Sequence, residues 1–297
     1  MVRGSFDHLI NIYFKFNAMR NLFVGRIMPL LCLLAWMLMA CEQPLMTTDE
    51  EAVEDSSVEV DDETEHTLKV YVNNLESRCT RLNYVLFQNG NKLKTFTQKR
   101  ADSDFGHKNF DLAPGTYQLL LLAYDGDSNP TISSPEKITF GNKSPGMSDV
   151  LYAYQELTVT EEASTLYIPL RWASSTFQLH STDDVPSWVR SIRIYYTGGS
   201  STLSALTGMG NANSRQEVIF DINDSMIGSP LLLEVYSFPR TDRNIKMQIT
   251  ISNDSQVLLE RQYDDIRLYP GSLLRYEGRF FGETQEEMQK IYLTPFE

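Results

Sequence analysis

Short runs in which apolar and polar residues alternate are the dominant pattern of this sequence. Residues 67–73 (TLKVYVN) form one such run, and residues 82–87 and 92–97 flank an Asn-Gly pair at 89–90, which is typical of tight β-hairpins. Side chains on a strand point alternately to its two faces, so each run can bury one face and expose the other. The best candidate for a helix, residues 283–290, is short. We therefore predict an all-β fold.

The number and spacing of the predicted strands indicate more than one β-sandwich. Turn residues recur every ~8–12 residues, as they do in sandwich domains. So many strands exceed one ordinary sandwich, and the chain is long enough to bury two modest cores. We predict two tandem β-sandwich domains, over residues 66–168 and 169–297. The further runs lie at residues 117–124, 150–160, 164–172, 176–180, 191–196, 216–222, 231–237, 245–251, 256–262 and 272–280.

The N-terminus carries the pattern of a lipoprotein signal peptide. Arg20 and Arg26 form a short basic region, and the apolar run at residues 27–40 is shorter than the ~20 residues of a membrane-spanning helix. Leu-Met-Ala at 38–40 then precedes Cys41, an arrangement known as a lipobox. We predict a signal peptide over residues 1–40 and a diacylglycerol on the thiol of Cys41, with a buried helix that happens to end in cysteine as the alternative. This covalent acyl lipid is the one cofactor expected, and no metal is.

Residues 41–65 are predicted to form a solvated tether between the lipid and the folded body. Residues 42–65 contain 11 acidic residues and no Lys or Arg. Self-repulsion and a shortage of apolar side chains keep such a segment unfolded. The run also resembles the surface-export signal of Bacteroidota lipoproteins, although a plain acidic linker explains the same charge pattern equally well.

Charge and cysteine content limit the partners and the means of stabilisation. Removal of residues 1–40 takes away four Lys or Arg and one Asp, which changes the net charge from −13 to −16. Nucleic-acid binding requires a basic surface, so we expect no nucleic-acid partner. Cys32 leaves with the signal peptide and Cys41 is acylated, so Cys79 has no partner for an internal disulfide. We expect stability to come from packing alone.

The sequence gives little support for catalysis. Asp183-Asp184 and Asp264-Asp265 are adjacent pairs, and adjacent side chains on an extended chain point to opposite faces, which makes them poor catalytic pairs. We predict that the protein is not an enzyme, and a hydrolase without a recognisable motif is the weakest alternative. The histidines left after cleavage stand in no zinc-binding or catalytic motif: His66, His107 and His180.

Two weaker patterns allow a ligand-binding interpretation beside a structural one. Residues 125–129 (DGDSN) place side-chain oxygens at alternate positions, as a Ca²⁺ loop does, but a hairpin turn is favoured because the distal Glu is missing. A set of aromatic residues could stack on sugars if the rings are exposed. Aromatic residues are enriched in strands in any case, so packing in the core is the favoured interpretation. These aromatic residues are Tyr152, Tyr154, Tyr167, Trp172, Tyr195 and Tyr196.

Several short stretches resemble the fimbrillin superfamily of Bacteroidales, in particular the minor, FimB-type anchor lipoproteins of type V pili. The resemblance implies two transthyretin-like β-sandwiches in tandem and fimbrillin-type subunits as partners. It also implies a position at the cell surface, with the lipid in the outer membrane. The stretches are the lipobox at 38–41, LAPGTY at 112–117, SDVLYA at 148–153, LRW at 170–172, VPSWV at 185–189, IRLYPG at 266–271 and YEG at 276–278.

The resemblance also implies a way of binding, because related subunits polymerise by exchanging strands. A sandwich that lacks a strand exposes unpaired backbone groups beside an apolar groove, and a partner's strand completes the sheet. The C-terminal segment alternates apolar residues and is the candidate donor strand, with a frayed terminus as the alternative. It consists of Ile291, Tyr292, Leu293, Thr294, Pro295 and Phe296.

The distribution of arginine bears on the place of the subunit in a fibre. Polymer-forming fimbrillins are cleaved near the N-terminus by an arginine-specific protease, but residues 42–68 of this chain contain no arginine. This absence favours a subunit that keeps its lipid and ends the polymer, although Arg78, Arg81, Arg100 and Arg171 remain as candidate cleavage sites. The predicted function is a membrane-anchored accessory subunit of a surface fimbria, active in cell adhesion. A surface glycan-binding lipoprotein is the alternative.

Overall fold

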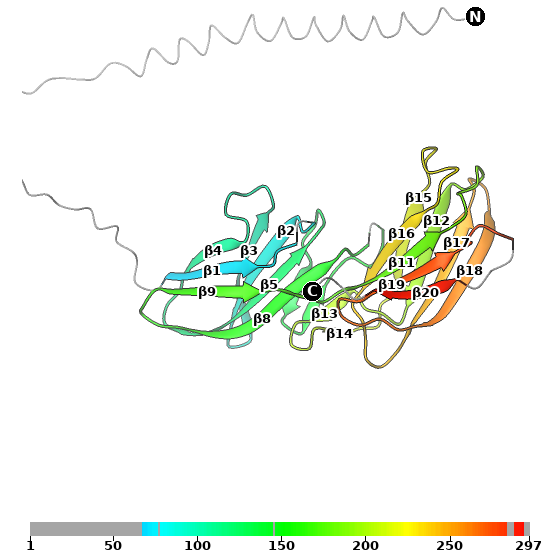
Figure 1. Cartoon of the computed structure of the whole chain (residues 1–297). Helices are drawn as coiled ribbons and strands as arrows, with labels where there is room; N and C mark the ends of the chain where they lie inside the picture. Colours follow the sequence, from blue (N-terminus) through cyan, green and yellow to red (C-terminus); the bar gives the residue numbers. More distant parts are fainter. Residues whose placement is uncertain (1–66, 77, 145, 284–287, 294–297) are drawn as a thin grey trace, which may run out of the picture. The chain divides into compact units, whose positions relative to one another are not determined.

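The computed structural model describes residues 67–76, 78–144, 146–283 and 288–293, which belong to one compact unit (Figure 1). These residues form strands and loops and include no helix, so the all-β prediction is confirmed. In the described part of the chain there is accordingly no helix that is long and apolar enough to cross a membrane. The predicted signal peptide, Cys41 and the tether lie outside the described residues.

The first half of the body is a sandwich of two sheets. Its strands are β1 (Thr67–Asn73), β2 (Arg81–Gln88), β3 (Asn91–Lys99), β4 (His107–Asp111), β5 (Gly115–Tyr124), β8 (Val150–Val159), β9 (Ser164–Pro169) and β10 (Arg171–Trp172). The smaller sheet has the order β4-β1-β9, in which β1 and β9 are parallel. The larger, antiparallel sheet has the order β10-β8-β5-β2-β3. Side chains of both sheets, including Leu68, Tyr84 and Leu119, meet in a buried core.

The second half repeats this plan with two four-stranded sheets. Its strands are β11 (Ser175–Ser181), β12 (Ser191–Thr197), β15 (Gln216–Asp221), β16 (Leu232–Ser237), β17 (Ile245–Ser252), β18 (Val257–Ile266), β19 (Leu273–Gly278) and β20 (Gln289–Leu293). The sheets have the orders β16-β11-β19-β20 and β15-β12-β17-β18, and β11 and β19 are parallel. Phe177, Ile194 and Ile249 belong to the core between them.

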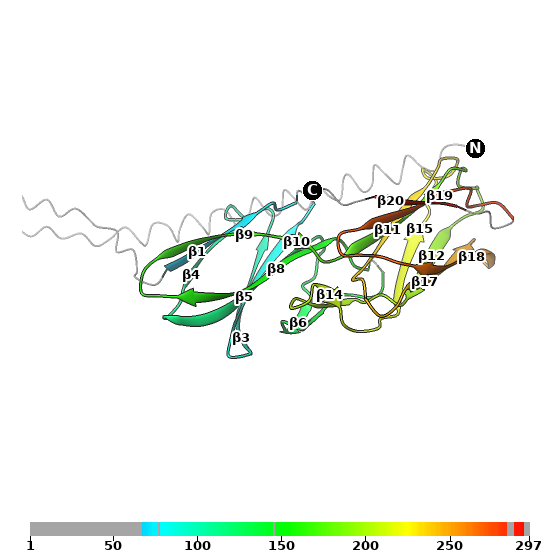
Figure 2. The ribbon, with the colours of Figure 1, turned by 60° about the horizontal axis from the view of Figure 1, so that its bottom comes forward.

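A smaller sheet, which we call the junction sheet, joins the two halves. It consists of β6 (Thr131–Ser134), β7 (Lys137–Thr139), β13 (Thr202–Ser204) and β14 (Met209–Gly210), in the order β14-β13-β7-β6. Figure 2 shows β6 and β14 between the halves. β7 from the first half pairs antiparallel with β13 from the second, and a third core with Val85, Leu203 and Phe238 lies beneath. The halves therefore share a sheet and a core, while the domain boundary expected between residues 168 and 169 stays a prediction.

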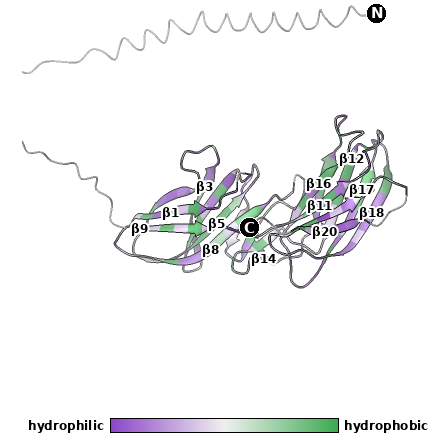
Figure 3. Ribbon diagram, viewed as in Figure 1, coloured by the Kyte–Doolittle hydropathy of each residue, from purple (hydrophilic) through white to green (hydrophobic). Residues whose placement is uncertain are grey.

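The central strands of the first half explain an unusual run in the sequence. Residues 119–122 of β5 are four consecutive leucines, a pattern without alternation. Leu119 and Leu121 point into the core of the sandwich, whereas Leu120 and Leu122 point into the third core beneath the junction sheet. Strands that are less deeply covered show mixed hydropathy along their length (Figure 3). A strand buried on both faces reads as a continuous apolar run, as this one does.

The two local predictions in these halves have different outcomes. The hairpin is confirmed, since β2 and β3 pair around Asn89 and Gly90, whose φ angles of 51° and 77° suit a type I′ turn. The prediction of a helix at residues 283–290 is wrong at its C-terminal end, because Gln289 and Lys290 belong to β20. Residues 284–287 lie outside the described residues. A helix this short gains little from its own hydrogen bonds, whereas pairing with β19 satisfies the backbone.

Candidate functional site

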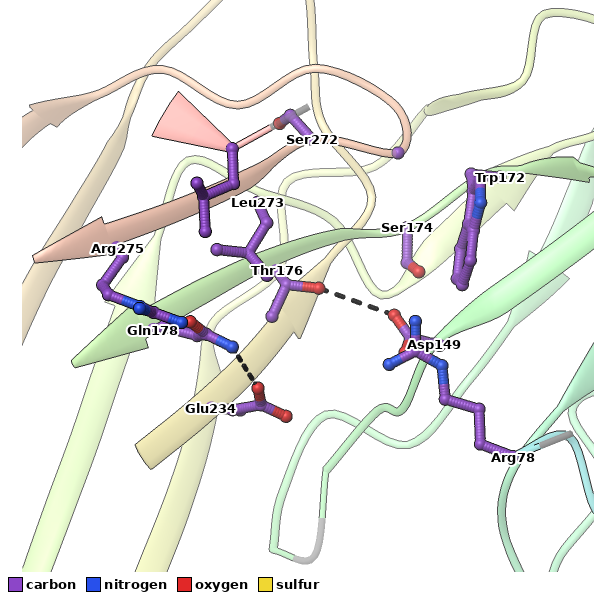
Figure 4. Close-up of a pocket in the computed structure, with 12 residues that line it drawn as sticks. Arg78, Asp149, Trp172, Ser174, Thr176, Gln178, Glu234, Ser272, Leu273 and Arg275 are labelled. Carbon is purple, nitrogen blue, oxygen red and sulfur yellow. Dashed lines mark hydrogen bonds and ion pairs between the residues drawn. The ribbon is translucent and has the colours of Figure 1, made fainter. Parts of the chain in front are cut away.

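A pocket of about 380 Å³ lies where the two halves meet (Figure 4). Arg78, Asp149 and Trp172 line it from the first half, and side chains of β11, β16 and β19 line it from the second. In Figure 4 the first group and the Gln178–Glu234 pair lie on opposite sides of Thr176. Polar groups from both halves thus converge on one cavity, which is typical of a ligand site.

The short link between β10 and β11 sets the position of this pocket. Trp172 ends β10, and the next two residues, Ala173 and Ser174, donate their amides to the carbonyl of Val150 at 2.9 and 3.3 Å. The Ser174 hydroxyl in turn accepts the amide of Val150 at 2.9 Å. These bonds tie the link to the start of β8, so Asp149, the residue before Val150, is held next to the second half.

Asp149 is a buried carboxylate that pairs with Arg78. The Arg78 guanidinium lies 2.6 Å from the carboxylate, whose side chain is 6% exposed, and it also lies over the Trp172 ring at 5.0 Å. Burial raises the pKa of Asp149 to about 6, although the charge of Arg78 acts to lower it. The cost of burying the charge therefore exceeds the gain from the ion pair.

A second polar chain crosses the other side of the pocket. Arg275 Nε donates to Gln178 Oε1 at 2.8 Å, and the Gln178 amide donates to Glu234. The Tyr236 hydroxyl donates to the same carboxylate at 2.8 Å. Burial raises the pKa of Tyr236, which keeps this hydroxyl protonated as a donor. Each group is fixed by its neighbours, so the polar face is rigid before any ligand arrives.

The burial of Asp149 predicts a pH-dependent stability. Because its pKa is about 6 in the folded protein and near 4 in an unfolded chain, the folded state binds the proton more tightly, and stability falls as pH rises from about 4 to about 6. The free energy of unfolding of wild type relative to Asp149→Asn should drop by roughly 2–3 kcal/mol across this window. Urea unfolding at several pH values measures this difference.

The matched control is Asp254→Asn, at a carboxylate whose side chain is 82% exposed. Its stability relative to wild type should stay flat over the same window, because exposed ion pairs contribute little to stability. Parallel pH curves for wild type and Asp149→Asn would contradict the prediction.

The candidate site residues named from the sequence are found only in part. Ile291, Tyr292 and Leu293 lie in β20, paired with β19 of the same chain, and Leu293 also lines the pocket. Thr294, Pro295 and Phe296 lie outside the described residues, as does the lipid-attachment residue Cys41. The donor-strand role and the lipid therefore stay predictions.

The loop at residues 125–129 is explained by an arginine. The Arg81 guanidinium donates to the carbonyl of Gly126 at 2.6 Å, to that of Asp127, and to Asn129 Oδ1 at 3.4 Å. Of the side-chain oxygens at alternate positions, that of Asn129 thus already accepts from a cation, and one of Asp125 accepts from the Thr80 hydroxyl at 2.6 Å, which supports the turn interpretation. Within the described residues, no group of three or more His, Cys, Asp or Glu is placed to hold a metal ion.

The aromatic residues separate into core and surface. Tyr152 and Tyr196 are buried, as the packing interpretation predicts, and Trp172 borders the pocket. Tyr167 is 66% exposed and stacks on Tyr71 with ring centroids 5.2 Å apart. The stack covers one face of the Tyr167 ring, and Tyr71 is stacked in turn on His107 with ring centroids 4.4 Å apart.

The polar residues weighed for catalysis have structural partners. The two oxygens of Asp183 accept the amides of Phe280 and Phe281 at 2.7 and 2.8 Å, so this carboxylate fixes the segment that follows β19. His180 Nδ1 lies 2.9 Å from Glu277 across the β11–β19 pair. These contacts explain both residues without a reaction.

Most of the pocket residues carry no local signal in the sequence. Gln178, Glu234 and Arg275 lie on three different strands, and they meet because β11 pairs with both β16 and β19. Trp172 could be singled out as an aromatic candidate, and Asp149 stands inside the SDVLYA stretch. The other residues become neighbours only once it is known which strands pair with which.

Comparison with known proteins gives a likeness of fold. No protein-family model matches the chain, and no curated protein matches it significantly. A Bacteroides ovatus protein described as a candidate adhesin is 13% identical, covers 74% of this chain and 88% of its own, and gives a TM-score of 0.50. A candidate polysaccharide-binding protein of Bacteroides thetaiotaomicron is 11% identical, with 72% and 92% covered and a TM-score of 0.47.

The fimbrial anchor protein Mfa2 of Porphyromonas gingivalis is 9% identical, with 71% of this chain and 90% of that chain covered and a TM-score of 0.42. At these identities a likeness concerns the fold. The transthyretin-like label stays a prediction. The chain therefore shares the all-β fold of the Bacteroides ovatus protein.

Proposed function

We propose that the protein is a membrane-anchored accessory subunit of a surface fimbria. A lipid on Cys41 holds it in the outer membrane at the cell surface, and the body joins fimbrillin-type subunits by strand complementation. The lipobox and the acidic tether support the anchor. The fold shared with a candidate adhesin supports a role in attachment and not in catalysis.

The observation that carries the proposal is the weak attachment of β20. Four of its five side chains are exposed, Ile291 is half-buried, and the strand lies at the edge of its sheet. Hydrophobic stabilisation scales with the apolar area that is buried, so these side chains contribute little. Leaving the sheet would cost β20 mainly its backbone hydrogen bonds with β19, and a new strand partner would replace them.

Strand β1, in contrast to β20, is firmly attached to the body. Leu68 and Val70 of β1 are buried in the core of the first sandwich, and the strand pairs on both sides, with β4 and β9. Detaching β1 would open that core, whereas detaching β20 exposes the backbone of β19 beside the buried Leu274 and Tyr276. Strand β20 is therefore better suited to exchange than β1.

A strain that lacks the gene tests the anchoring role. Fimbriae are counted by electron microscopy on the cells and in the cell-free medium, beside the parent strain. We expect long filaments that are loose in the medium, because the fibre has lost its attachment to the membrane. Fimbriae that stay attached and of normal length would contradict the proposal.

A disulfide that locks β20 tests strand complementation separately. Glu277 and Gln289 are partners in register, and partners in antiparallel strands have Cα atoms about 4.5–5.5 Å apart, within disulfide reach. The double variant Glu277→Cys, Gln289→Cys should fold and reach the surface but enter fibres only after reduction. Each single variant should enter normally. Equal incorporation of the locked form with and without reductant would exclude β20 as the exchanged strand.

A further inference from the structure

We propose that the pocket between the two halves binds a neutral carbohydrate, one or two sugar rings at a time. This inference does not rest on the fimbrial role. It follows from the charge balance of the pocket, its preformed polar groups and its apolar wall.

The charges of the pocket favour a ligand without net charge. Two guanidinium groups, of Arg78 and Arg275, line it beside two carboxylates, of Asp149 and Glu234. Asp149 is paired with Arg78, and Glu234 is joined to Arg275 through Gln178. The two carboxylates would repel an anionic ligand, and the two guanidinium groups would repel a cationic ligand. A neutral ligand rich in hydroxyl groups avoids either repulsion and can still accept from the arginines and donate to the acids.

The polar groups are already held in place. Gln178 is 5% exposed, and its amide bridges the arginine and the acid by hydrogen bonds on both sides. Thr176 and Asp149 are buried as well, and their side chains lie 3.5 Å apart. Groups that are fixed before binding lose little conformational entropy when a ligand arrives. Neighbouring hydroxyl groups of a sugar ring match such planar amide, carboxylate and guanidinium groups.

The remaining wall is apolar and suits the carbon-bound hydrogens of a sugar ring. Trp172 lines one side, and Leu273 and Leu293 line another. The volume of about 380 Å³ falls near the lower end of ligand pockets, which span roughly 300–1,000 Å³, so one or two rings fit.

Binding of defined sugars to the lipidated protein tests this inference. The protein is purified from membranes in a detergent without a sugar head group. Maltotriose, cellotriose, mannotriose and xylotriose serve as neutral probes, and trigalacturonic acid serves as the anionic one. Tryptophan fluorescence and calorimetry follow each titration. We expect saturable binding of at least one neutral probe, with a change in the emission of Trp172, and no binding of the acid.

Three variants assign the signal to the pocket. Trp172→Ala should weaken binding of the neutral probe by about tenfold, the loss expected when most of an aromatic contact is removed. Trp188→Phe, outside the pocket, should bind like wild type. Glu234→Gln keeps the shape of the side chain but removes one negative charge. The pocket then has a net positive charge, so trigalacturonic acid should bind to this variant. Circular dichroism shows that each variant is folded.

The inference is overturned if none of the neutral probes saturates, or if Trp172→Ala, shown to be folded, binds as well as wild type. Binding of the acid alone by wild type would overturn it too, because the charge-balance argument would then be wrong. None of these outcomes affects the count of fimbriae in the deletion strain.

Discussion

Replacement of Cys41 by alanine is expected to remove the protein from the outer membrane. A diacylglycerol brings two acyl chains, and each buried methylene contributes ~0.8 kcal/mol, whereas one chain alone binds a membrane only marginally. After the predicted removal of residues 1–40 the net charge would be −16, from 22 basic and 38 acidic residues, so the body gains nothing from an anionic membrane surface. Without the thiol both chains are lost together, and the anchor with them.

Metabolic labelling with an alkyne fatty acid, followed by membrane fractionation, measures this effect. The Cys41→Ala protein should carry no label and be absent from the outer-membrane fraction. Cys32→Ala is the matched control, because it changes a cysteine inside the predicted signal peptide and should leave both label and location unchanged. A labelled Cys41→Ala protein in the outer membrane would contradict the lipobox prediction.

Replacement of Phe238 by alanine is expected to destabilise the body and to separate the unfolding of its halves. Phe238 is fully buried in the third core, where its ring meets Phe140 edge-on at 5.4 Å. Its backbone bonds to Ser200, which precedes β13 of the junction sheet. Truncating such a ring costs about 3–5 kcal/mol, because it leaves a cavity as well as losing burial. The cavity lies in the part of the core that the halves share.

Two tryptophans make the separation measurable. Trp172 lies in the first half and Trp188 in the second, so the variants Trp188→Phe and Trp172→Phe each leave one reporter in the body of the mature chain. Their urea unfolding curves should coincide in an otherwise wild-type protein and diverge after Phe238→Ala. Tyr292→Ala, at a ring that is 57% exposed, is the control and should change stability by less than about 0.5 kcal/mol. Coincident curves after Phe238→Ala would show that the third core does not couple the halves.

These two residues illustrate how far prediction from the sequence extends. Cys41 is found from a linear pattern, because a basic region, an apolar run and a cysteine are read in order along the chain. Phe238 stands in no such pattern. Its importance arises where the third core meets the junction sheet, whose strands β7 and β13 pair although they are far apart in sequence.

The sequence by itself determined the all-β class and the β2–β3 hairpin. These features depend on interactions between residues a few positions apart: alternation over two faces, and the positive φ that Asn and Gly accept. The tertiary structure alone decided the parallel pairs β1–β9 and β11–β19, the junction sheet and the pocket. Arg275 and Gln178 are 97 positions apart, and their meeting depends on long-range strand pairing that local patterns do not encode.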